Sequence, residues 1–240
     1  MMNSCYTGNG TFVIGHRGAK GYFPENTPLS VSKAIEFGVD AVEVDVFLCA
    51  SGELVVFHDK KVDRLTNGYG NIEQLTLDSI KKLKVLESEK IPTLNEVLDL
   101  IDSRILINIE LKGQNTAIPT AILLRELFLS SKWTPDKVII SSFIWEELKI
   151  FSNQKTSVKI AVLTEEDPIK AINIAKELNA IAINPKFTLL NNENVSIIKE
   201  NGFQIHTWTV NSIEDINKMR LFGVDAIITD YPDRAILTGK

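Results

Sequence analysis

The sequence predicts a (β/α)8 barrel that carries one extra antiparallel strand. The chain has 240 residues, which is close to the usual size of a one-domain α/β barrel. Short β-branched runs alternate with amphipathic stretches at intervals of roughly 20–25 residues, as consecutive strand–helix units around a parallel sheet do. One link between two predicted strands is too short for a parallel connection, and it indicates the extra strand.

Nine segments have the composition of strands. The predicted strands are 12–15, 41–48, 54–58, 105–111, 138–142, 160–163, 180–184, 204–210 and 226–230. The predicted helices in the second half are 145–152, 168–178, 191–201 and 212–222. Gly202 and Gly223 follow two of these helices, where a helix stop is expected. In the first half, Thr27 is a predicted N-cap and Pro28 the first residue of a helix that ends near Gly38.

The link 49–53 reduces nine strand candidates to eight barrel strands. A parallel crossover needs a dozen or more residues, so the strands before and after this link form an antiparallel hairpin. Pairing about the turn sets His58 opposite about Val44, near the side chains of Glu43 and Asp45. The hairpin is therefore expected to bring a histidine to two carboxylates.

A long segment, 59–92, follows the hairpin. It is polar and punctuated by glycine, with a predicted short helix near 76–84. A connection of this length is unusual in a barrel unless it is functional, so we interpret it as a small cap over the site. The chain is otherwise predicted to be a single domain over residues 1–240, without a linker or a second domain.

Composition excludes several classes of protein. A net charge of −5 argues against a nucleic-acid-binding surface. Cys5 and Cys49 form neither a zinc spacing nor a disulfide framework. No apolar run reaches the roughly 18 residues of a membrane span, and the N-terminus does not resemble an export signal. We expect no stable membrane insertion and a cytoplasmic location, and the sequence leaves a homodimer open.

Two strands are predicted to direct carboxylates into the barrel. Alternation along 41–48 points Glu43 and Asp45 to the side opposite the valines, and alternation along 105–111 does the same for Glu110. Three buried carboxylates repel one another unless they are neutralised. A bound divalent cation of the oxygen-seeking kind, Mg²⁺ or Ca²⁺, would neutralise them, although pairing with Arg17 and Lys112 alone is the alternative.

Two of the three histidines are expected at the same rim. His16 ends the first strand, on the side where barrel enzymes keep their catalytic groups, and His58 ends the hairpin. Two histidines with Arg17 and Lys112 as cations suit attack on a phosphate ester, in which one imidazole removes a proton and the other donates one. A single histidine is more often a hydrogen-bonded core residue, which is the interpretation we favour for His206.

Two aromatic residues are predicted near the mouth. Trp208 and Phe143 follow barrel strands, and each is equally compatible with a substrate-lining role and with plain packing. The glycine-containing segments 8–10 and 66–70 are predicted turns, because neither lies between a strand and a helix as a phosphate-binding loop does.

Taken in order, the motifs resemble those of the glycerophosphodiester phosphodiesterase family. The principal motifs are His16-Arg-Gly18, Pro24-Glu-Asn-Thr27, Glu43-Val-Asp45, Val55-Val-Phe-His-Asp59 and Ile109-Glu-Leu-Lys112. Supporting motifs are Arg64-Leu-Thr-Asn-Gly68, Ile91-Pro-Thr-Leu94, Trp208-Thr-Val-Asn211 and Thr229-Asp-Tyr-Pro232. The resemblance implies a (β/α)8 barrel with an insertion after the hairpin. It also implies metal-dependent hydrolysis of a small-molecule glycerophosphodiester to sn-glycerol 3-phosphate and an alcohol.

The resemblance also implies a role for each matching residue. It makes His16 and His58 the acid–base pair, and Glu43, Asp45 and Glu110 the ligands of one divalent cation, Mg²⁺ or Ca²⁺. Arg17 and Lys112 would bind phosphate, and Phe143 and Trp208 would line the glycerol or headgroup side.

Two positions depart from the family pattern, and two rival activities remain. The hairpin turn reads Cys49-Ala-Ser-Gly52 where Thr-Lys-Asp-Gly is common, and Pro28 replaces an aliphatic residue; neither touches the expected chemistry. A lysophospholipase D or sphingomyelinase D-like activity would need a wide apolar mouth, which the polar cap does not offer. A non-catalytic barrel that binds phosphorylated glycerol is the other rival, and the intact set of histidines and carboxylates argues against it.

Overall fold

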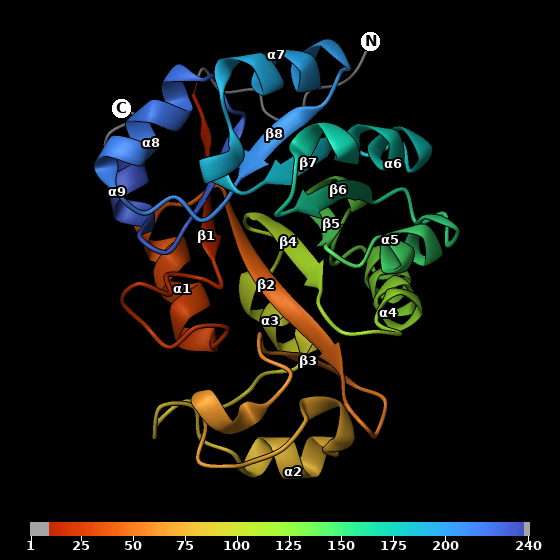
Figure 1. Cartoon of the computed structure of the whole chain (residues 1–240). Helices are drawn as coiled ribbons and strands as arrows, with labels where there is room; N and C mark the ends of the chain where they lie inside the picture. Colours follow the sequence, from red (N-terminus) through yellow and green to blue (C-terminus); the bar gives the residue numbers. More distant parts are fainter. Residues whose placement is uncertain (1–9, 238–240) are drawn as a thin grey trace.

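Eight parallel strands form a closed ring with helices around it (Figure 1). The computed structural model describes residues 10–237. The ring strands are β1 (Phe12–His16), β2 (Ala41–Leu48), β4 (Leu106–Leu111), β5 (Val138–Ser142), β6 (Lys159–Thr164), β7 (Ala182–Pro185), β8 (Gln204–Thr207) and β9 (Ala226–Thr229). β1 pairs in parallel with both β2 and β9, which closes the ring and confirms the predicted barrel.

Each barrel strand is followed by a helix, as a (β/α)8 fold requires, and a further helix lies within residues 59–92. The helices are α1 (Pro28–Phe37), α2 (Leu77–Lys82), α3 (Leu94–Ile101), α4 (Ala117–Leu129), α5 (Trp145–Ser152), α6 (Ala171–Glu177), α7 (Asn192–Glu200), α8 (Ile213–Leu221) and α9 (Pro232–Leu237). Short 3₁₀ helices occupy η1 (Val62–Arg64), η2 (Ile72–Gln74), η3 (Pro135–Lys137), η4 (Pro168–Lys170) and η5 (Phe187–Leu189). The Thr27 hydroxyl accepts from the Ser30 amide at the start of α1, and Gly38 ends the helix with a φ of 86°, as predicted.

Side-chain alternation along β2 separates the core from the lumen. Val42, Val44 and Val46 are fully buried in the apolar layer between strands and helices. Glu43 and Asp45 lie on the other face of the same strand, inside the barrel. Burying the valines against the helices therefore fixes both carboxylates in the lumen.

The extra strand is β3 (Leu54–Val56), which pairs antiparallel with β2. It is shorter than the predicted 54–58. The register pairs Val46 with Val56, and the Phe57 amide donates to the Asp45 carbonyl at 3.0 Å. Continued two residues, this register sets His58 beside Val44, as the length of the turn predicts.

Residues 59–92 form the lower lobe in Figure 1, with β2 reaching down into it. Although these residues are mostly polar, they contain a small apolar core. Apolar side chains of the lobe pack on Phe47, Val55 and Phe57 of the hairpin. The buried members from the lobe itself are Val62, Leu65, Ile72, Ile80, Val85 and Ile91. We call residues 59–92 the cap.

Some expectations stay predictions. Within residues 10–237 no helix is both long enough and apolar enough to cross a bilayer. The expectations for Cys5, for the N-terminal leader and for most of the turn 8–10 concern residues outside the described part of the chain. The single-domain organisation, the cytoplasmic location, the absence of nucleic-acid binding and the homodimer also stay predictions.

Candidate active site

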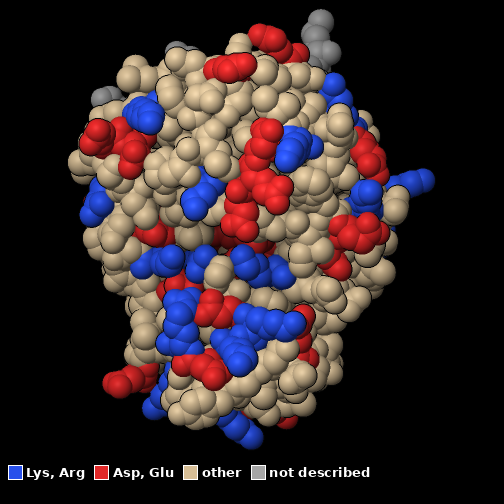
Figure 2. Space-filling model, in the orientation of Figure 1, with Lys and Arg blue, Asp and Glu red and all other residues tan. Residues whose placement is uncertain are grey.

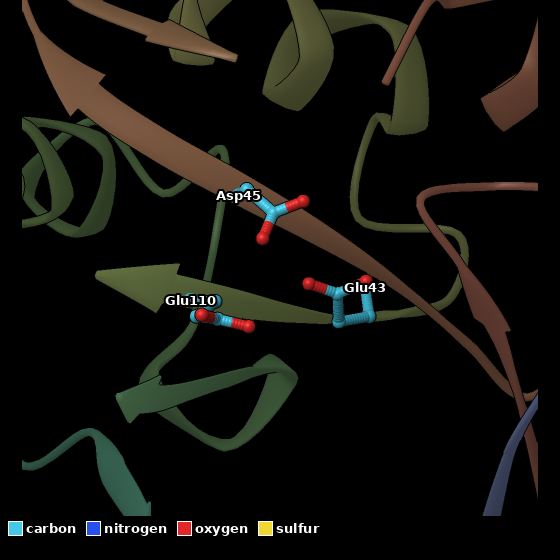
Figure 3. A group of neighbouring side chains, drawn as sticks. All are labelled: Glu43, Asp45 and Glu110. Atoms are coloured by element: carbon cyan, nitrogen blue, oxygen red, sulfur yellow. The ribbon is translucent and has the colours of Figure 1, made fainter. Parts of the chain in front are cut away.

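Three carboxylates from the neighbouring strands β2 and β4 meet inside the barrel, near its mouth. Glu43 and Asp45 come from β2 and Glu110 from β4, and one oxygen of each lies within 4.8 Å of the others (Figure 3). The register between the two strands pairs Asp45 with Glu110, which explains why these side chains share one place. They lie beside a cavity of about 390 Å³ that opens at the barrel mouth.

Burial makes this trio unequal in charge. Burial and the charge of Asp45 raise the pKa of Glu43 well above its ordinary value, and the same two causes raise the pKa of Glu110 to about 7. Burial acts in the same direction on Asp45, but the charges of Arg17 and Lys112 outweigh it and hold the pKa of Asp45 below its ordinary value. Asp45 is therefore the carboxylate that the protein itself keeps ionised.

The neighbouring cations neutralise only part of the trio. Arg17 Nε lies 3.2 Å from Asp45 Oδ2, and Lys112 Nζ lies 2.8 Å from Glu110 Oε1 and 3.7 Å from Asp45 Oδ1. Glu43 Oε2 accepts from the Arg17 amide at 2.9 Å, while Glu43 Oε1 is buried with no hydrogen-bond partner among residues 10–237. An orphaned carboxylate oxygen beside two other carboxylates fits a hard divalent cation, since such ions bind oxygen ligands.

The turn after β1 orients Arg17 through an unusual backbone. Arg17 and Gly18 have φ values of 51° and 85°. A Cβ on Gly18 would lie 2.5 Å from atoms of Ser30, so both the positive φ and the close approach require glycine. Ser30 Oγ donates to the Arg17 carbonyl at 2.9 Å and fixes the turn.

His16 is held from inside the ring. Its Nδ1 lies 2.6 Å from Oδ1 of Asp230, which directly follows β9. Burial raises the pKa of Asp230, but the hydrogen bond with His16, the charges of His16 and Lys20 and the hydrogen bond from Asn211 together outweigh it and bring that pKa to about 2. An ionised carboxylate only accepts, so Nδ1 carries the proton and Nε2 is the free nitrogen. That Nε2 lies 4.0 Å from Glu43 Oε2.

His58 is held in the same way from the cap side. Its Nδ1 lies 2.6 Å from Asp59 Oδ1. Burial raises the pKa of Asp59, but the hydrogen bonds from Arg64 and His58 outweigh it and bring that pKa to about 2. Nδ1 therefore donates and Nε2 is free. Burial, above all, lowers the pKa of both His16 and His58, so that both imidazoles are neutral near pH 7.

A chain of ion pairs joins the cap to the barrel. Arg64 Nε contacts Asp59 Oδ2 at 2.5 Å, and Arg64 Nη2 contacts Glu25 Oε1 at 2.9 Å. Glu25 Oε1 also accepts from Arg17 Nη1 at 2.7 Å. Asn26, the next residue, donates from its side-chain Nδ2 to Asp45 Oδ2 at 2.8 Å.

Four of these partners have no role in the sequence interpretation: Glu25, Asn26, Asp59 and Asp230. The sequence nevertheless contains features that could have identified these four residues. Glu25 and Asn26 belong to the Pro24-Glu-Asn-Thr27 motif, and Asp59 follows His58 directly. Asp230 follows the last barrel strand, and closure of a barrel sets the last strand against the first.

The two predicted aromatic residues line the same cavity. Phe143 and Trp208 meet edge to face with ring centroids 5.3 Å apart, and Trp208 Nε1 donates to the Asn184 carbonyl at 2.8 Å. His206, in contrast, is buried beneath the site beside Gln204, and burial lowers its pKa to about 3. The structure thus brings all nine predicted site residues to one mouth and places His206 in the core, as predicted.

Comparisons with known proteins place this site in a family. Residues 16–234 match the model of the glycerophosphoryl diester phosphodiesterase family. A glycerophosphodiester phosphodiesterase of Caldanaerobacter subterraneus subsp. tengcongensis is 37% identical over 234 residues, covering 94% of this chain and 96% of the relative. A glycerophosphodiester phosphodiesterase of Bacillus subtilis (strain 168) is 33% identical, covering 92% of this chain and 84% of the relative.

A solved structure shows the same architecture. An Oleispira antarctica phosphodiesterase in complex with the product sn-glycerol-3-phosphate superposes with a TM-score of 0.87 at 28% identity. The match covers 94% of this chain and 95% of that chain. The likeness extends over nearly the whole barrel and includes the region of the cap.

Proposed function

This chain belongs to the glycerophosphoryl diester phosphodiesterase family and acts as a phosphodiesterase, and from that premise we propose that it hydrolyses glycerophosphodiesters to sn-glycerol 3-phosphate and an alcohol, with His16 and His58 as the acid–base pair. One observation carries the proposal. Two neutral imidazoles, each fixed at Nδ1 by an aspartate, flank a buried carboxylate trio at one mouth. The product bound to the Oleispira antarctica relative supports the same product here.

Glu43, Asp45 and Glu110 are the proposed ligands of one divalent cation, Mg²⁺ or Ca²⁺. The orphaned Glu43 oxygen and the raised pKa values of Glu43 and Glu110 support a site that needs a positive charge. When bound, such an ion supplies that charge and polarises a phosphoryl oxygen.

Arg17 and Lys112 are the proposed phosphate-binding groups. Both cations already lie against the carboxylates that surround the cavity, so they can face phosphoryl oxygens from the same side. Phe143 and Trp208 provide an apolar wall for the carbon atoms of the glycerol arm.

The two histidines balance the protons over two steps. The glycerol hydroxyl next to the phosphate attacks phosphorus, and one imidazole Nε2 takes its proton. The other imidazole takes up a proton from solvent at Nε2 when the anionic phosphodiester binds beside it, and it gives that proton to the departing alcohol oxygen. The product of that step is a cyclic phosphate. Water then opens the ring with the roles reversed: the second histidine takes a proton from water, and the first returns its proton to the glycerol oxygen. Asp59 and Asp230 stabilise each imidazolium as it forms.

A lipid-specific activity stays an untested alternative. Most apolar side chains of the cap pack in its own cluster, and the exposed Tyr69 and Leu86 line neither cavity at the site. They therefore do not form an apolar entrance for an acyl chain.

Exhaustive chelation followed by reconstitution tests the proposal. We expect chelation to abolish release of both products from glycerophosphocholine, glycerophosphoethanolamine, glycerophosphoglycerol and glycerophosphoinositol, and Mg²⁺ or Ca²⁺ to restore it. Full activity after chelation would contradict the metal role. A product other than sn-glycerol 3-phosphate would contradict the proposed cleavage.

A further inference from the structure

Two cavities open from the reaction centre in different directions. The first, described above, contains His16, Glu43 and the aromatic pair. The second has a volume of about 580 Å³ and lies between the cap and the loop after β4. Figure 2 shows a hollow between the barrel and the lower lobe, with basic and acidic side chains on both sides.

The two cavities share His58, Lys112 and Ile144. Lys112 is a proposed phosphate ligand and His58 a proposed acid–base group, so the phosphoryl group belongs at this junction. A phosphodiester has two arms, and each cavity can accept one. The glycerol arm belongs in the first, because that cavity holds both histidines, and the attacking hydroxyl and the departing oxygen each need one of them.

Glu73 faces the second cavity from the cap helix η2. It approaches the barrel closely: a Cβ on Gly113 would lie 3.2 Å from Glu73 Oε1 and 2.7 Å from Phe47 Cδ1. The glycine thus leaves room for the Glu73 carboxylate beside the loop that carries Lys112.

Glu73 is the weakly engaged carboxylate of this cavity. Its Oε2 lies 3.7 Å from Lys60 Nζ, whose side chain is 70% exposed, while Glu73 itself is 25% exposed. Such a pair at an exposed lysine is weak. The other carboxylate lining the cavity, Asp59, is committed to His58 and Arg64 at short distances.

We infer that the second cavity receives the departing alcohol, and that Glu73 selects alcohols bearing an amino or ammonium group. This inference rests on the proposed function. A half-buried carboxylate attracts an ammonium group more strongly than a neutral polyol, because solvent screens the charge less there. Glu73 touches none of the reacting atoms, so its effect belongs in KM and not in kcat.

Glu73→Gln tests the inference on two substrates that differ only in the departing alcohol. For glycerophosphoethanolamine we expect KM to rise about fivefold with kcat within about twofold. For glycerophosphoglycerol we expect KM to stay within about twofold. Glu87→Gln, at an exposed cap position outside both cavities, is the matched control and should change neither substrate.

Lys60→Gln provides a test in the opposite direction. Removing the competing cation should lower KM for glycerophosphoethanolamine and leave glycerophosphoglycerol unchanged. An equal change for both substrates in Glu73→Gln would overturn the inference. A loss selective for glycerophosphoethanolamine in Glu165→Gln, at the rim of the first cavity, with Glu73→Gln unaffected would also overturn it. If the wild-type protein cleaves neither substrate, the proposed function itself fails.

Discussion

The barrel and the cap each support one histidine, and so one half, of the proposed acid–base pair. His16 and His58 both have Nδ1 at 2.6 Å from an aspartate oxygen. Asp230, the partner of His16, lies 214 positions away in sequence and is set in place by closure of the ring. Asp59, the partner of His58, is its neighbour in the chain. The two histidine–aspartate pairs thus have the same geometry, but different parts of the fold hold them in place.

The difference shows which half depends on the cap. β1 pairs on both sides with other strands, so His16 is fixed by the sheet itself. His58 lies beyond the end of β3, and Arg64 of the cap ties its partner Asp59 to Glu25. The histidine supported by the barrel is also the less exposed one, since the side chain of His16 is 13% exposed and that of His58 is 25% exposed. The barrel half is rigid through backbone pairing, and the cap half is rigid through side-chain ion pairs.

The largest expected effect is common to both halves. His16→Ala and His58→Ala should each lower kcat by about 10²- to 10⁴-fold, because each removes one proton-transfer group. Steady-state kinetics with saturating metal measures this, and circular dichroism checks the fold. Near-normal turnover in either variant would remove that histidine from the mechanism.

Replacing the aspartates should separate the halves. Asp230→Asn and Asp59→Asn keep an acceptor for Nδ1–H but withdraw the charge that stabilises the imidazolium, so kcat should fall about 10- to 100-fold. We expect the larger loss for Asp230→Asn, because Asp230 also accepts from Asn211 at 2.9 Å and orders the β9 end. In the pH profile, the acid limb should move to lower pH in both variants, since a histidine without its carboxylate has a lower pKa. An unmoved acid limb would mean that the aspartates only shape the site.

Arg64→Gln tests the support of the cap half alone. It should lower kcat/KM about fivefold, because Asp59 loses its strongest partner and His58 becomes less well oriented. Combined with Asp59→Asn it should add little, since both changes break one network. Arg104→Gln, in the loop after α3, where Arg104 donates to the Ile101 carbonyl, is the control and should leave kinetics unchanged. Full additivity of the two site changes would show that the ion-pair chain does not act through Asp59.

The smallest effect concerns the stability of the barrel half. The pKa of Glu110 is raised from 4.5 to about 7, by burial and by the charge of Asp45, so the folded state holds this proton more tightly than the unfolded chain. The stability that protonated Glu110 contributes is fully present at pH values below its ordinary pKa of 4.5, and it is lost as the pH rises toward about 7. Metal-free protein should therefore lose about 3 °C in Tm between about pH 5 and about pH 8.

Saturating Mg²⁺ should reduce that loss, because the ion stabilises the ionised trio. Glu110→Gln should flatten the pH dependence in the metal-free protein. Thermal unfolding at several pH values measures the pH dependence of Tm for the metal-free protein, the Mg²⁺-saturated protein and Glu110→Gln. The same slope with and without metal would contradict the assignment of the trio as its ligands.

The sequence predicted the features that depend on local spacing. The alternation along β2 placed Glu43 and Asp45 in the lumen, and the short link 49–53 placed His58 opposite Val44. Both follow from strand geometry, which has a period of two residues whatever the tertiary context.

Features that depend on tertiary packing were not predicted. The hydrogen bond between His16 and Asp230 required knowing which strands close the ring, and the chain of pairs through Arg64 and Glu25 required the position of the cap. The apolar core of the cap was also missed. Residues such as Val62, Ile72 and Ile80 are spaced irregularly over 3₁₀ turns and one short helix, so no periodic pattern reveals them.

Closure of the ring by β1 and β9 has a consequence for synthesis. His16 emerges from the ribosome early, but the carboxylate that sets its tautomer follows 214 positions later. A nascent chain therefore has His58 and Asp59 together long before His16 gains its partner. The enzyme becomes competent only when its last barrel strand docks, so hydrolytic activity during refolding reports completion of the cylinder and not its initiation.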